Sequence, residues 1–473
     1  MLLPFLRDMP KGGDLHNHLD GAIYAEDLIN FAADAGVCVD RTSSRLLAPP
    51  CDDSCANYTA KPLASCAYTD QVLYNQIIDA WSLRNWNPGN ESGHDHFFAT
   101  FDKFGLASHT HVAEAIATST NRAGQDHLQY VEYMHTADGG AAAGLAAKVE
   151  WNPDFAKMRD ALIAAGLKDV AAETSKKLAA DDARAREIMK CGTADAMPGC
   201  SVTIRYLYQV LRGLPQQIVF TQILLGFELA SSDPRFVGLN LVMAEDWYVP
   251  IRDFREHMAM LDYLHSVYPK VHIALHAGEL AIGLVPPEDL TFHIRSSVER
   301  GHAERIGHGV DVMNETDPIQ LLHEMAERNI LVEIALTSND IILGVSGDDH
   351  PLPIYMKCGV PVALATDDEG VNRSDMTHEY LRAVETYHLS YTDLKCMARQ
   401  SLEHSFLPGE SLWKDTKFVF RITPACGGDV IGAAKPSAAC EQFLSSSERA
   451  REQWNLEARF AEFEKKYESS TFR

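Results

Sequence analysis

Eight short apolar runs recur along the chain, separated by stretches with helical spacing, and this alternation constrains the fold most strongly. Strands that alternate with helices build parallel sheets, and eight such units predict a (β/α)8 TIM barrel. An open, doubly wound sheet is the alternative, because periodicity does not prove closure. No glycine-rich phosphate loop follows the first run, which favours the barrel. The expected strands are 13–15, 128–133, 217–225, 236–242, 271–275, 305–307, 330–335 and 360–365.

Two segments are longer than an ordinary connection between a strand and a helix. Residues 38–93 are rich in Cys, Ser, Asn and Pro, and residues 137–212 are rich in Ala and Lys, with helical spacing at 155–165 and 170–189. We expect both to be insertions in one hydrolase domain that spans residues 1–473. A C-terminal extension is expected from about residue 410, where the charged stretch 446–467 has the apolar spacing of a surface helix.

The charge of the chain limits its partners. A formal net charge of -24 is unfavourable for binding a nucleic acid or an anionic membrane, and it favours a small neutral or cationic substrate. No apolar run reaches the roughly 18 residues of a transmembrane helix. The opening Met1–Pro10 is too short for a signal peptide, so any export signal would be absent from this numbering.

Eight of the ten cysteines are clustered, in a pattern that suits local disulfide bonds in an oxidising compartment. This predicts an exported protein, either periplasmic or secreted. The alternatives are reduced thiols in the cytoplasm, and a structural zinc site built from the first four cysteines. The clustered residues are Cys38, Cys51, Cys55 and Cys66, then Cys191 and Cys200, then Cys426 and Cys440.

Four residues at the ends of predicted strands have the chemistry of metal ligands. His16 and His18 form an H-x-H pair, and alternate residues of an extended segment point to the same side. His276 ends one apolar run and Asp367 ends another. Three imidazoles and one carboxylate suit a single Zn²⁺ ion and leave a position for water. Structural histidines would be the simpler explanation of H-x-H alone.

Three further residues beside these ligands are candidates for proton transfer. Glu279 follows His276 by three residues, and burial among apolar groups would raise the pKa of its carboxyl. His308 lies between two glycines and is open to the same space, where it could take a proton from water. Asp368 adjoins Asp367 and needs a donor to hold it. A helix-capping Glu and a core His are the simpler alternatives for the first two.

Other strand ends also carry carboxylates. Asp20 follows His18 by two residues, and Glu245 and Asp246 follow the run 236–242. For Glu245 and Asp246 a solvated loop position is as good an explanation as a functional one.

Four motifs together resemble the adenosine deaminase family of zinc amidohydrolases. They are H-N-H-L-D-G at 16–21, H-A-G-E at 276–279, R-I-G-H-G-V-D at 305–311 and A-T-D-D at 365–368. The resemblance runs from about residue 10 to residue 407. The Cys-bearing segment before D-H-F-F at 95–98 is similar to the secreted, growth-factor-related branch.

The resemblance implies a reaction and a role for each candidate residue. Zinc-activated water would attack C6 of adenosine or 2′-deoxyadenosine, giving inosine and ammonia. Glu279 would protonate N1, His308 would handle the water proton and Asp368 would bond N7. Asp20 would contact the ribose. The zinc ligands would be His16, His18, His276 and Asp367.

Two departures from the family pattern leave the substrate open. Met243 stands where a glycine amide usually approaches the purine, and Glu369 stands where a proline is common. Adenine or a modified adenosine is therefore an alternative substrate. A two-metal amidohydrolase is disfavoured because neither the run 217–225 nor the run 236–242 contains the bridging Lys. A non-catalytic nucleoside-binding or signalling protein, and a homodimer, also remain open.

Overall fold

Eight parallel strands form a closed barrel at the centre of the computed structural model, which describes residues 2–52, 55, 59–416 and 420–470. Their order around the barrel follows the chain, and Asp367 closes it by pairing with Asn17 on the first strand. The predicted TIM barrel is therefore confirmed. The strands are β1 (Gly12–His18), β4 (Leu128–His135), β5 (Thr203–Leu211), β6 (Phe236–Val242), β7 (His272–Ala277), β8 (Arg305–His308), β9 (Leu331–Ile334) and β10 (Val362–Leu364).

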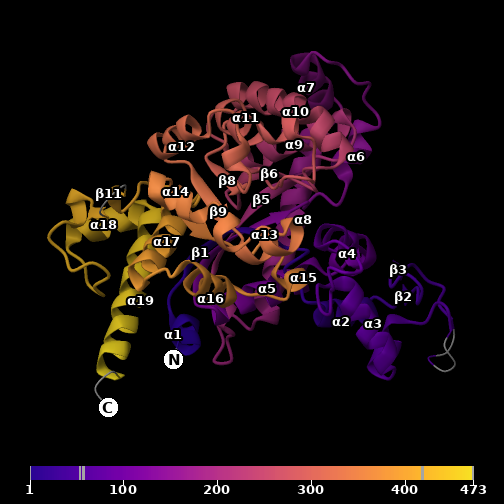
Figure 1. The fold of residues 1–473 in the computed structure, drawn as a ribbon, viewed down its shortest axis with the longest axis horizontal. Helices are drawn as coiled ribbons and strands as arrows, with labels where there is room; N and C mark the ends of the chain where they lie inside the picture. Colours follow the sequence, from indigo (N-terminus) through magenta and orange to yellow (C-terminus); the bar gives the residue numbers. More distant parts are fainter. Residues whose placement is uncertain (1, 53–54, 56–58, 417–419, 471–473) are drawn as a thin grey trace.

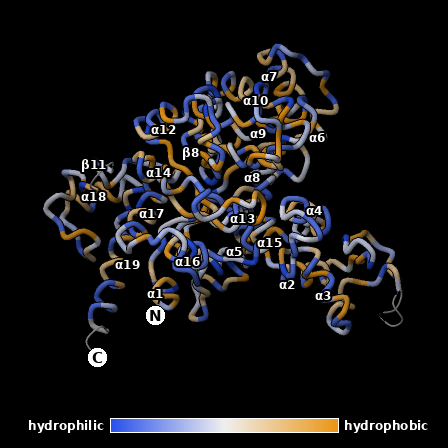
Figure 2. The backbone as a smooth tube through the Cα atoms, viewed as in Figure 1, coloured by the Kyte–Doolittle hydropathy of each residue, from blue (hydrophilic) through white to orange (hydrophobic). Residues whose placement is uncertain are grey.

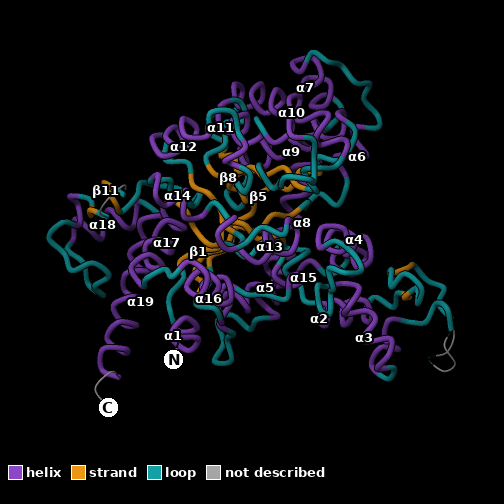
Figure 3. The backbone as a smooth tube through the Cα atoms, in the orientation of Figure 1, coloured by secondary structure: helices purple, strands orange, loops and turns teal. Residues whose placement is uncertain are grey.

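Helices surround the barrel on all sides, as Figure 3 shows. Hydrophobic residues of the strands lie toward the centre of the molecule, while hydrophilic residues are frequent on the outer helices (Figure 2). The helices of the barrel and its mouth are α1 (Leu2–Asp8), α2 (Ala25–Asp34), α4 (Gly93–Ser108), α5 (Val112–Gln125), α9 (Gln216–Ser232), α10 (Tyr248–Val267), α11 (His293–Glu299), α12 (Pro318–Glu327), α13 (Leu336–Leu343), α14 (Leu352–Cys358), α15 (Glu369–Asn372), α16 (Met376–Tyr387) and α17 (Tyr391–Glu403).

The third strand differs from the expectation. The run 217–225 belongs to helix α9, and the strand is β5, which lies before it in the chain. A helix buried on every side is as apolar as a buried strand, so periodicity cannot separate the two. Helix α9 packs between the strands and helices α8 and α10, and its residues 219–227 are all buried. Strand β5 was hidden because Arg205 and Gln209 interrupt its apolar pattern.

The two expected insertions are extra structure in the connections that follow β1 and β4. The first contains β2 (Cys38–Val39), β3 (Leu46–Leu47) and α3 (Gln71–Trp81). The second contains α6 (Ala141–Ala146), α7 (Phe155–Ala164) and α8 (Leu167–Ile188). Both helical spacings predicted there are confirmed. The second segment, expected to reach residue 212, ends before β5 begins at Thr203.

The C-terminal extension has a small core of its own around Trp413, Leu444 and Trp454. It consists of β11 (Trp413–Asp415), β12 (Arg421–Ile422), α18 (Ala438–Ser446) and α19 (Glu448–Ser470). The predicted surface helix is α19, which buries Leu456, Phe460 and Phe463 against the main core. In Figure 1 this extension lies on the opposite side of the barrel from α3, β2 and β3.

All eight clustered cysteines form disulfide bonds, as predicted. The bonds join Cys38 to Cys51, Cys55 to Cys66, Cys191 to Cys200 and Cys426 to Cys440. A zinc site in residues 38–66 is thereby excluded. Four disulfides indicate an oxidising environment. Among the described helices, none combines the length and the apolar character that crossing a membrane requires.

Candidate active site

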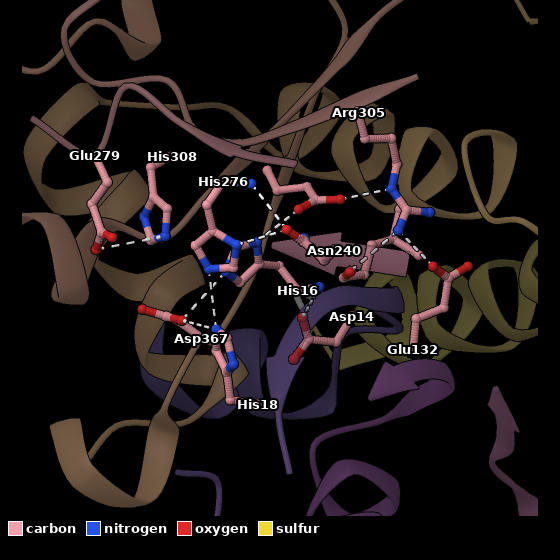
Figure 4. Close-up of polar contacts among 12 residues, drawn as sticks. Asp14, His16, His18, Glu132, Asn240, His276, Glu279, Arg305, His308 and Asp367 are labelled. Atoms are coloured by element: carbon pink, nitrogen blue, oxygen red, sulfur yellow. Dashed lines mark hydrogen bonds and ion pairs between the residues drawn. The ribbon is translucent and has the colours of Figure 1, made fainter. Parts of the chain in front are cut away.

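The candidate residues from distant motifs meet at the carboxyl ends of the strands. His16 and His18 lie at the end of β1, His276 is the penultimate residue of β7, and His308 ends β8. Asp367 follows β10 and bridges to β1. Figure 4 shows their side chains turned toward one another. A parallel barrel produces this convergence because all strands end at the same face.

Three of the histidines are held by an oxygen acceptor at Nδ1. His16 Nδ1 lies 2.7 Å from a Glu333 carboxylate oxygen, and His18 Nδ1 lies 2.9 Å from Oε1 of Gln209. His276 Nδ1 lies 2.9 Å from Oδ1 of Asn240. An oxygen acceptor at Nδ1 places the imidazole proton there, so Nε2 of each ring carries the lone pair. Such partners orient metal-binding histidines in many proteins.

The free ring nitrogens converge on the Asp367 carboxylate. His18 Nε2 lies 3.1 Å from His276 Nε2, and Oδ1 of Asp367 lies 3.3 Å from Nε2 of both His16 and His18. The Nε2 atom of His16 is buried and has no hydrogen-bond partner. Ser338 donates to the other Asp367 oxygen at 2.6 Å. Facing lone pairs repel each other unless a cation lies between them, so this donor set fits a divalent metal.

Electrostatics at these ligands suit a cation. Burial raises the pKa of Asp367, but His16 and His18 outweigh that effect and hold it well below its usual range. Burial and the neighbouring histidines keep the pKa of His276 well below its usual value, so its imidazole is neutral. Burial opposes charge on His16 too, yet Asp367 and Glu333 raise its pKa to about 10. A cation at Nε2 would take the place of that proton.

A buried ionic chain inside the barrel supports His16. Arg305 donates to Glu333 at 2.6 Å and to Glu132 at 2.5 Å, and Glu333 accepts from His16 (Figure 4). All of these side chains are buried. Because each charge has a partner, the chain avoids the cost of an isolated buried ion. Gly307 makes room for His16, since a Cβ there would lie 2.5 Å from its ring.

Glu279 and His308 lie together beside the ligand cluster. Their side chains approach to 3.6 Å, from Oε1 of Glu279 to Nε2 of His308 (Figure 4). Burial and the negative charge of Asp367 raise the pKa of Glu279 to about 8, so the carboxyl is a proton donor near neutral pH. Glu245 positions it, because its carboxylate accepts the backbone N–H groups of Gly278 and Glu279.

Asp368 offers a second neutral carboxyl to the same space. Burial, reinforced by Asp367, raises its pKa well above the usual range although His18 opposes the shift. Its Oδ1 atom is buried without a hydrogen-bond partner. Gly21 of the first motif makes this position available, because a Cβ there would lie 1.5 Å from that oxygen. The motif glycine therefore has a steric role that its sequence context did not reveal.

The outer part of the site contains Asp20 and Met243. Asp20 is partly exposed and lies 3.7 Å from the ring of His109. Met243 is half-buried with a φ of 85°, and its side chain lies against Gly213. His308 and Asp367 also have positive φ, at 69° and 57°. Strained non-glycine residues at three strand ends are a common mark of a functional site.

Other strand-end carboxylates have structural partners. Glu245 is fully buried and bonds His293 at 2.6 Å, so the solvated position considered for it is wrong. Oδ1 of Asp246 lies 2.8 Å from Nε2 of His94 on α4, and this hydrogen bond joins that helix to the mouth of the barrel. Glu369, at the other departure from the family pattern, is buried, and burial raises its pKa well above the usual range.

Sequence reasoning missed the residues that hold the ligands. Gln209, Asn240, Glu333 and Arg305 are polar residues within apolar strands, and this was the available signal. An isolated polar residue in a barrel strand points either into the barrel or outward against the surrounding helices. The sequence does not decide between these directions until the strand and its register are known.

Together the buried groups can bind a divalent metal and supply protons to a bound ring. The close groups include His16, His276, His308 and Asp367 as one set, and His18, Asp367 and Asp368 as another. The ligand side presents lone pairs, whereas Glu279 and Asp368 present protons. This arrangement suits hydrolysis of an electron-poor ring with several acceptor nitrogens.

A family model described as adenosine deaminase matches residues 168–414, just over half of the chain. Adenosine deaminase of Clostridium perfringens (strain 13 / Type A) is 30% identical over 139 residues, which is 29% of this chain and 39% of that protein. Adenosine deaminase of Escherichia coli (strain SMS-3-5 / SECEC) is 37% identical over 140 residues, again 29% of this chain and 39% of that protein. The chain thus spans about two fifths of the length of the curated relatives it matches.

Solved structures share the fold over most of the chain. An adenine deaminase from Arthrobacter aurescens has a TM-score of 0.51 at 17% identity, covering 84% of this chain and 94% of that one. An N6-methyl-AMP deaminase from Arabidopsis thaliana has a TM-score of 0.53 at 18% identity, covering 86% and 94%. At such identities the likeness concerns the barrel alone.

Proposed function

The chain belongs to the adenosine deaminase family, and from that premise we propose that it hydrolyses adenosine or 2′-deoxyadenosine. Water replaces the 6-amino group, and the products are ammonia and inosine or its 2′-deoxy form. The observation that carries this proposal is the pair of buried carboxyl groups with raised pKa beside the ligand cluster. Purine N1 and N7 are hydrogen-bond acceptors, so each needs a donor that is protonated near neutral pH.

Glu279 and Asp368 have the chemistry to provide these two donors. Glu279 would protonate N1 as the new bond forms at C6, which makes C6 more electrophilic. Asp368, with its unpartnered Oδ1, would donate to N7 and orient the ring. His308 faces the same space and would hold the attacking water. A nearby cation lowers both carboxyl pKa values, and burial opposes that effect.

The same residues that fit a divalent metal are proposed to hold one Zn²⁺ ion. His16, His18 and His276 would supply nitrogen ligands and Asp367 an oxygen ligand, a set typical of zinc. When bound, zinc supplies a lowered pKa, of roughly 7, for a coordinated water. The ligand set is supported by the three oxygen acceptors at Nδ1 and the converging Nε2 atoms.

Met243 favours a second candidate, a smaller or modified adenine compound. Met243 follows β6 with a positive φ, at the position where the family pattern has a glycine whose amide approaches the purine, so its side chain would reshape that part of the pocket. Adenine lacks the sugar that Asp20 would contact. A non-catalytic nucleoside-binding protein is disfavoured because Glu279, His308 and Asp368 are all present and all face the ligand cluster.

The loss of ultraviolet absorbance on deamination tests the substrate. Zinc-loaded enzyme is given adenosine, 2′-deoxyadenosine, adenine, AMP and N6-methyl-AMP in parallel, with ammonia measured for each. We expect the largest kcat/KM for a nucleoside, because Asp20 and the net charge of -24 disfavour a phosphate. Turnover of adenine alone would favour the second candidate. No turnover of any compound, with zinc bound, would contradict the deaminase proposal.

The disulfides support export of the protein to a periplasmic or extracellular space, the more specific form of the oxidising environment. Thiol titration of protein recovered from its native host distinguishes the compartments. Two reactive thiols after denaturation, from Cys358 and Cys396, are expected for the oxidised protein. Ten would place it in the cytoplasm.

A further inference from the structure

A chain of buried hydrogen bonds leads away from His308 and ends on the protein backbone. Asn339 Nδ2 lies 2.9 Å from His308 Nδ1, and Nε2 of His350 lies 3.0 Å from Asn339 Oδ1. The backbone N–H of Leu352 lies 3.1 Å from His350 Nδ1. Asn339 lies in the first turn of α13. The side chains of His308, Asn339 and His350, which form this relay, are at least 98% buried. Within the described part of the chain, neither the Asn339 nor the His350 side chain hydrogen-bonds to His16, His18, His276 or Asp367.

The backbone N–H of Leu352, at the far end of the relay from His308, determines the direction of every hydrogen bond in it. An N–H only donates, so Nδ1 of His350 accepts from Leu352. Burial, helped by the charge of Arg382, lowers the pKa of His350 to about 4, so the ring is neutral and its one proton is on Nε2. That proton is donated to Oδ1 of Asn339. A flipped Asn339 amide would set its N–H against the N–H of His350 and lose that bond.

The amide then determines the tautomer of His308. Asn339 Nδ2–H donates to His308 Nδ1, which must therefore be the acceptor. Burial lowers the pKa of His308 to about 3, so the ring is neutral. The geometry of the amide alone, however, already places a proton on Nε2, the atom that faces Glu279. His16, His18 and His276 have the opposite arrangement, with an oxygen acceptor at Nδ1.

We propose that Asn339 and His350 are positioning residues that hold His308 as an Nε2–H donor. This inference rests on the proposed function for the identity of the acceptor, which would be the attacking oxygen. A protonated Nε2 cannot bind a metal, so the relay separates His308 from the ligands although its ring is only 4.8 Å from that of His16. His308 therefore holds the attacking oxygen by donating to it, instead of taking its proton.

Asn339→Asp reverses the relay with almost no change of shape. A carboxylate accepts at both ends, so His308 Nδ1 must carry the proton and Nε2 must present its lone pair to the site. We expect kcat to fall at least 100-fold, KM to change less than threefold and zinc content to stay at one per chain. Asn329→Asp adds the same charge in the turn before β9, away from the relay, and serves as the matched control.

Nitrogen-15 NMR of histidine side chains reads the tautomer directly and needs no substrate. In zinc-loaded wild type, the signal lost in His308→Ala should have the shifts of an Nε2–H tautomer. In Asn339→Asp the two shifts should exchange. Nε2 of His308 found unprotonated in the wild type would overturn the proposal, even if adenosine is turned over. A correct tautomer without turnover would instead contradict only the proposed function.

Two substitutions at His350 distinguish a hydrogen-bonding role of this residue from a packing role. His350→Gln retains an N–H that can donate to Asn339, whereas His350→Leu has similar bulk and no donor. We expect Gln to recover kcat to within about tenfold of wild type and Leu to lose as much as Asn339→Asp, at equal zinc content. Equal losses in both variants, with unchanged His308 shifts, would show a packing role and overturn the proposal.

Discussion

The two sides of the site are built with opposite hydrogen-bond polarity. On the ligand side, acceptors from β5, β6 and β9 hold three imidazoles so that lone pairs face inward. On the proton side, Asn339 donates to His308 Nδ1, Glu245 accepts the backbone N–H of Glu279, and Gly21 leaves room for Asp368. The ligand supports are on barrel strands, while the proton supports are in loops and α13.

This difference leads us to propose that the residues for metal binding and those for proton transfer can be altered separately. A change on the ligand side should lower metal affinity, and activity should fall with it. A change on the proton side should leave the metal in place and lower turnover. The following substitutions test that division, beginning with the largest expected effect.

His276→Ala removes a proposed metal ligand that is buried and whose Nε2 lies 3.1 Å from that of His18. We expect zinc affinity to fall below detection by chelator competition and activity to fall at least roughly 10⁴-fold, because the metal activates the water. Stoichiometric tight zinc in this variant would show that His276 is not a ligand.

Glu279→Gln removes the proton donor but keeps the shape of the side chain. We expect kcat/KM to fall by roughly 10²–10⁴-fold, the usual range for a general acid, with zinc retained. In the wild type, kcat/KM should fall as pH rises through the pKa of this carboxyl, which burial raises to about 8 and a bound cation would lower, because the carboxyl then loses its proton. A wild-type profile that is flat to pH 10 would contradict this role of Glu279.

Gly21→Ala tests the position of Asp368 without changing a charged residue. The added Cβ would lie 1.5 Å from Asp368 Oδ1, so the carboxyl must move. A displacement of that size costs roughly 10²-fold in rate, and zinc should remain bound. Gly144→Ala, where nothing lies within 4 Å of the new Cβ, is the control and should act like wild type.

Gln209→Leu removes the acceptor of His18 Nδ1–H. We expect zinc affinity to fall by roughly 10–100-fold, as for the loss of such partners elsewhere, while kcat at saturating zinc changes little. Dialysis against graded zinc buffers measures both quantities. Unchanged affinity would mean that Gln209 does not support the ligand side.

The double change of Cys426 and Cys440 to Ser should leave the site untouched. The bond closes a sequence separation of 14 residues in the extension, and its loss should cost about 3 kcal/mol of stability there. Thermal unfolding measures the loss, and kcat and zinc content should match the wild type. A fall in zinc content would tie the extension to the ligand side.

The sequence predicted what is local and periodic. The ends of β1, β7, β8 and β10 were found because each combines an apolar run with polar residues at its end. Helix α9 was mistaken for a strand because burial on all sides removes the periodic signal. The disulfides followed from clustered cysteines, whose short separations leave few partners.

The supports of the site could not be predicted in the same way. Glu333 reaches His16 across 317 positions of sequence, and Gln209 reaches His18 across 191. Such pairs depend on barrel closure and strand register, which no local pattern contains. The proton tautomer of His308 depends on the backbone of Leu352, so it becomes visible only when the whole relay is in place.

The most direct test measures zinc content and adenosine turnover on the same preparations of wild type, His276→Ala and Glu279→Gln. One zinc with turnover is expected in the wild type, neither in His276→Ala, and one zinc without appreciable turnover in Glu279→Gln. If Glu279→Gln lost its zinc, or turned over adenosine at the wild-type rate, the division into a ligand side and a proton side would be wrong.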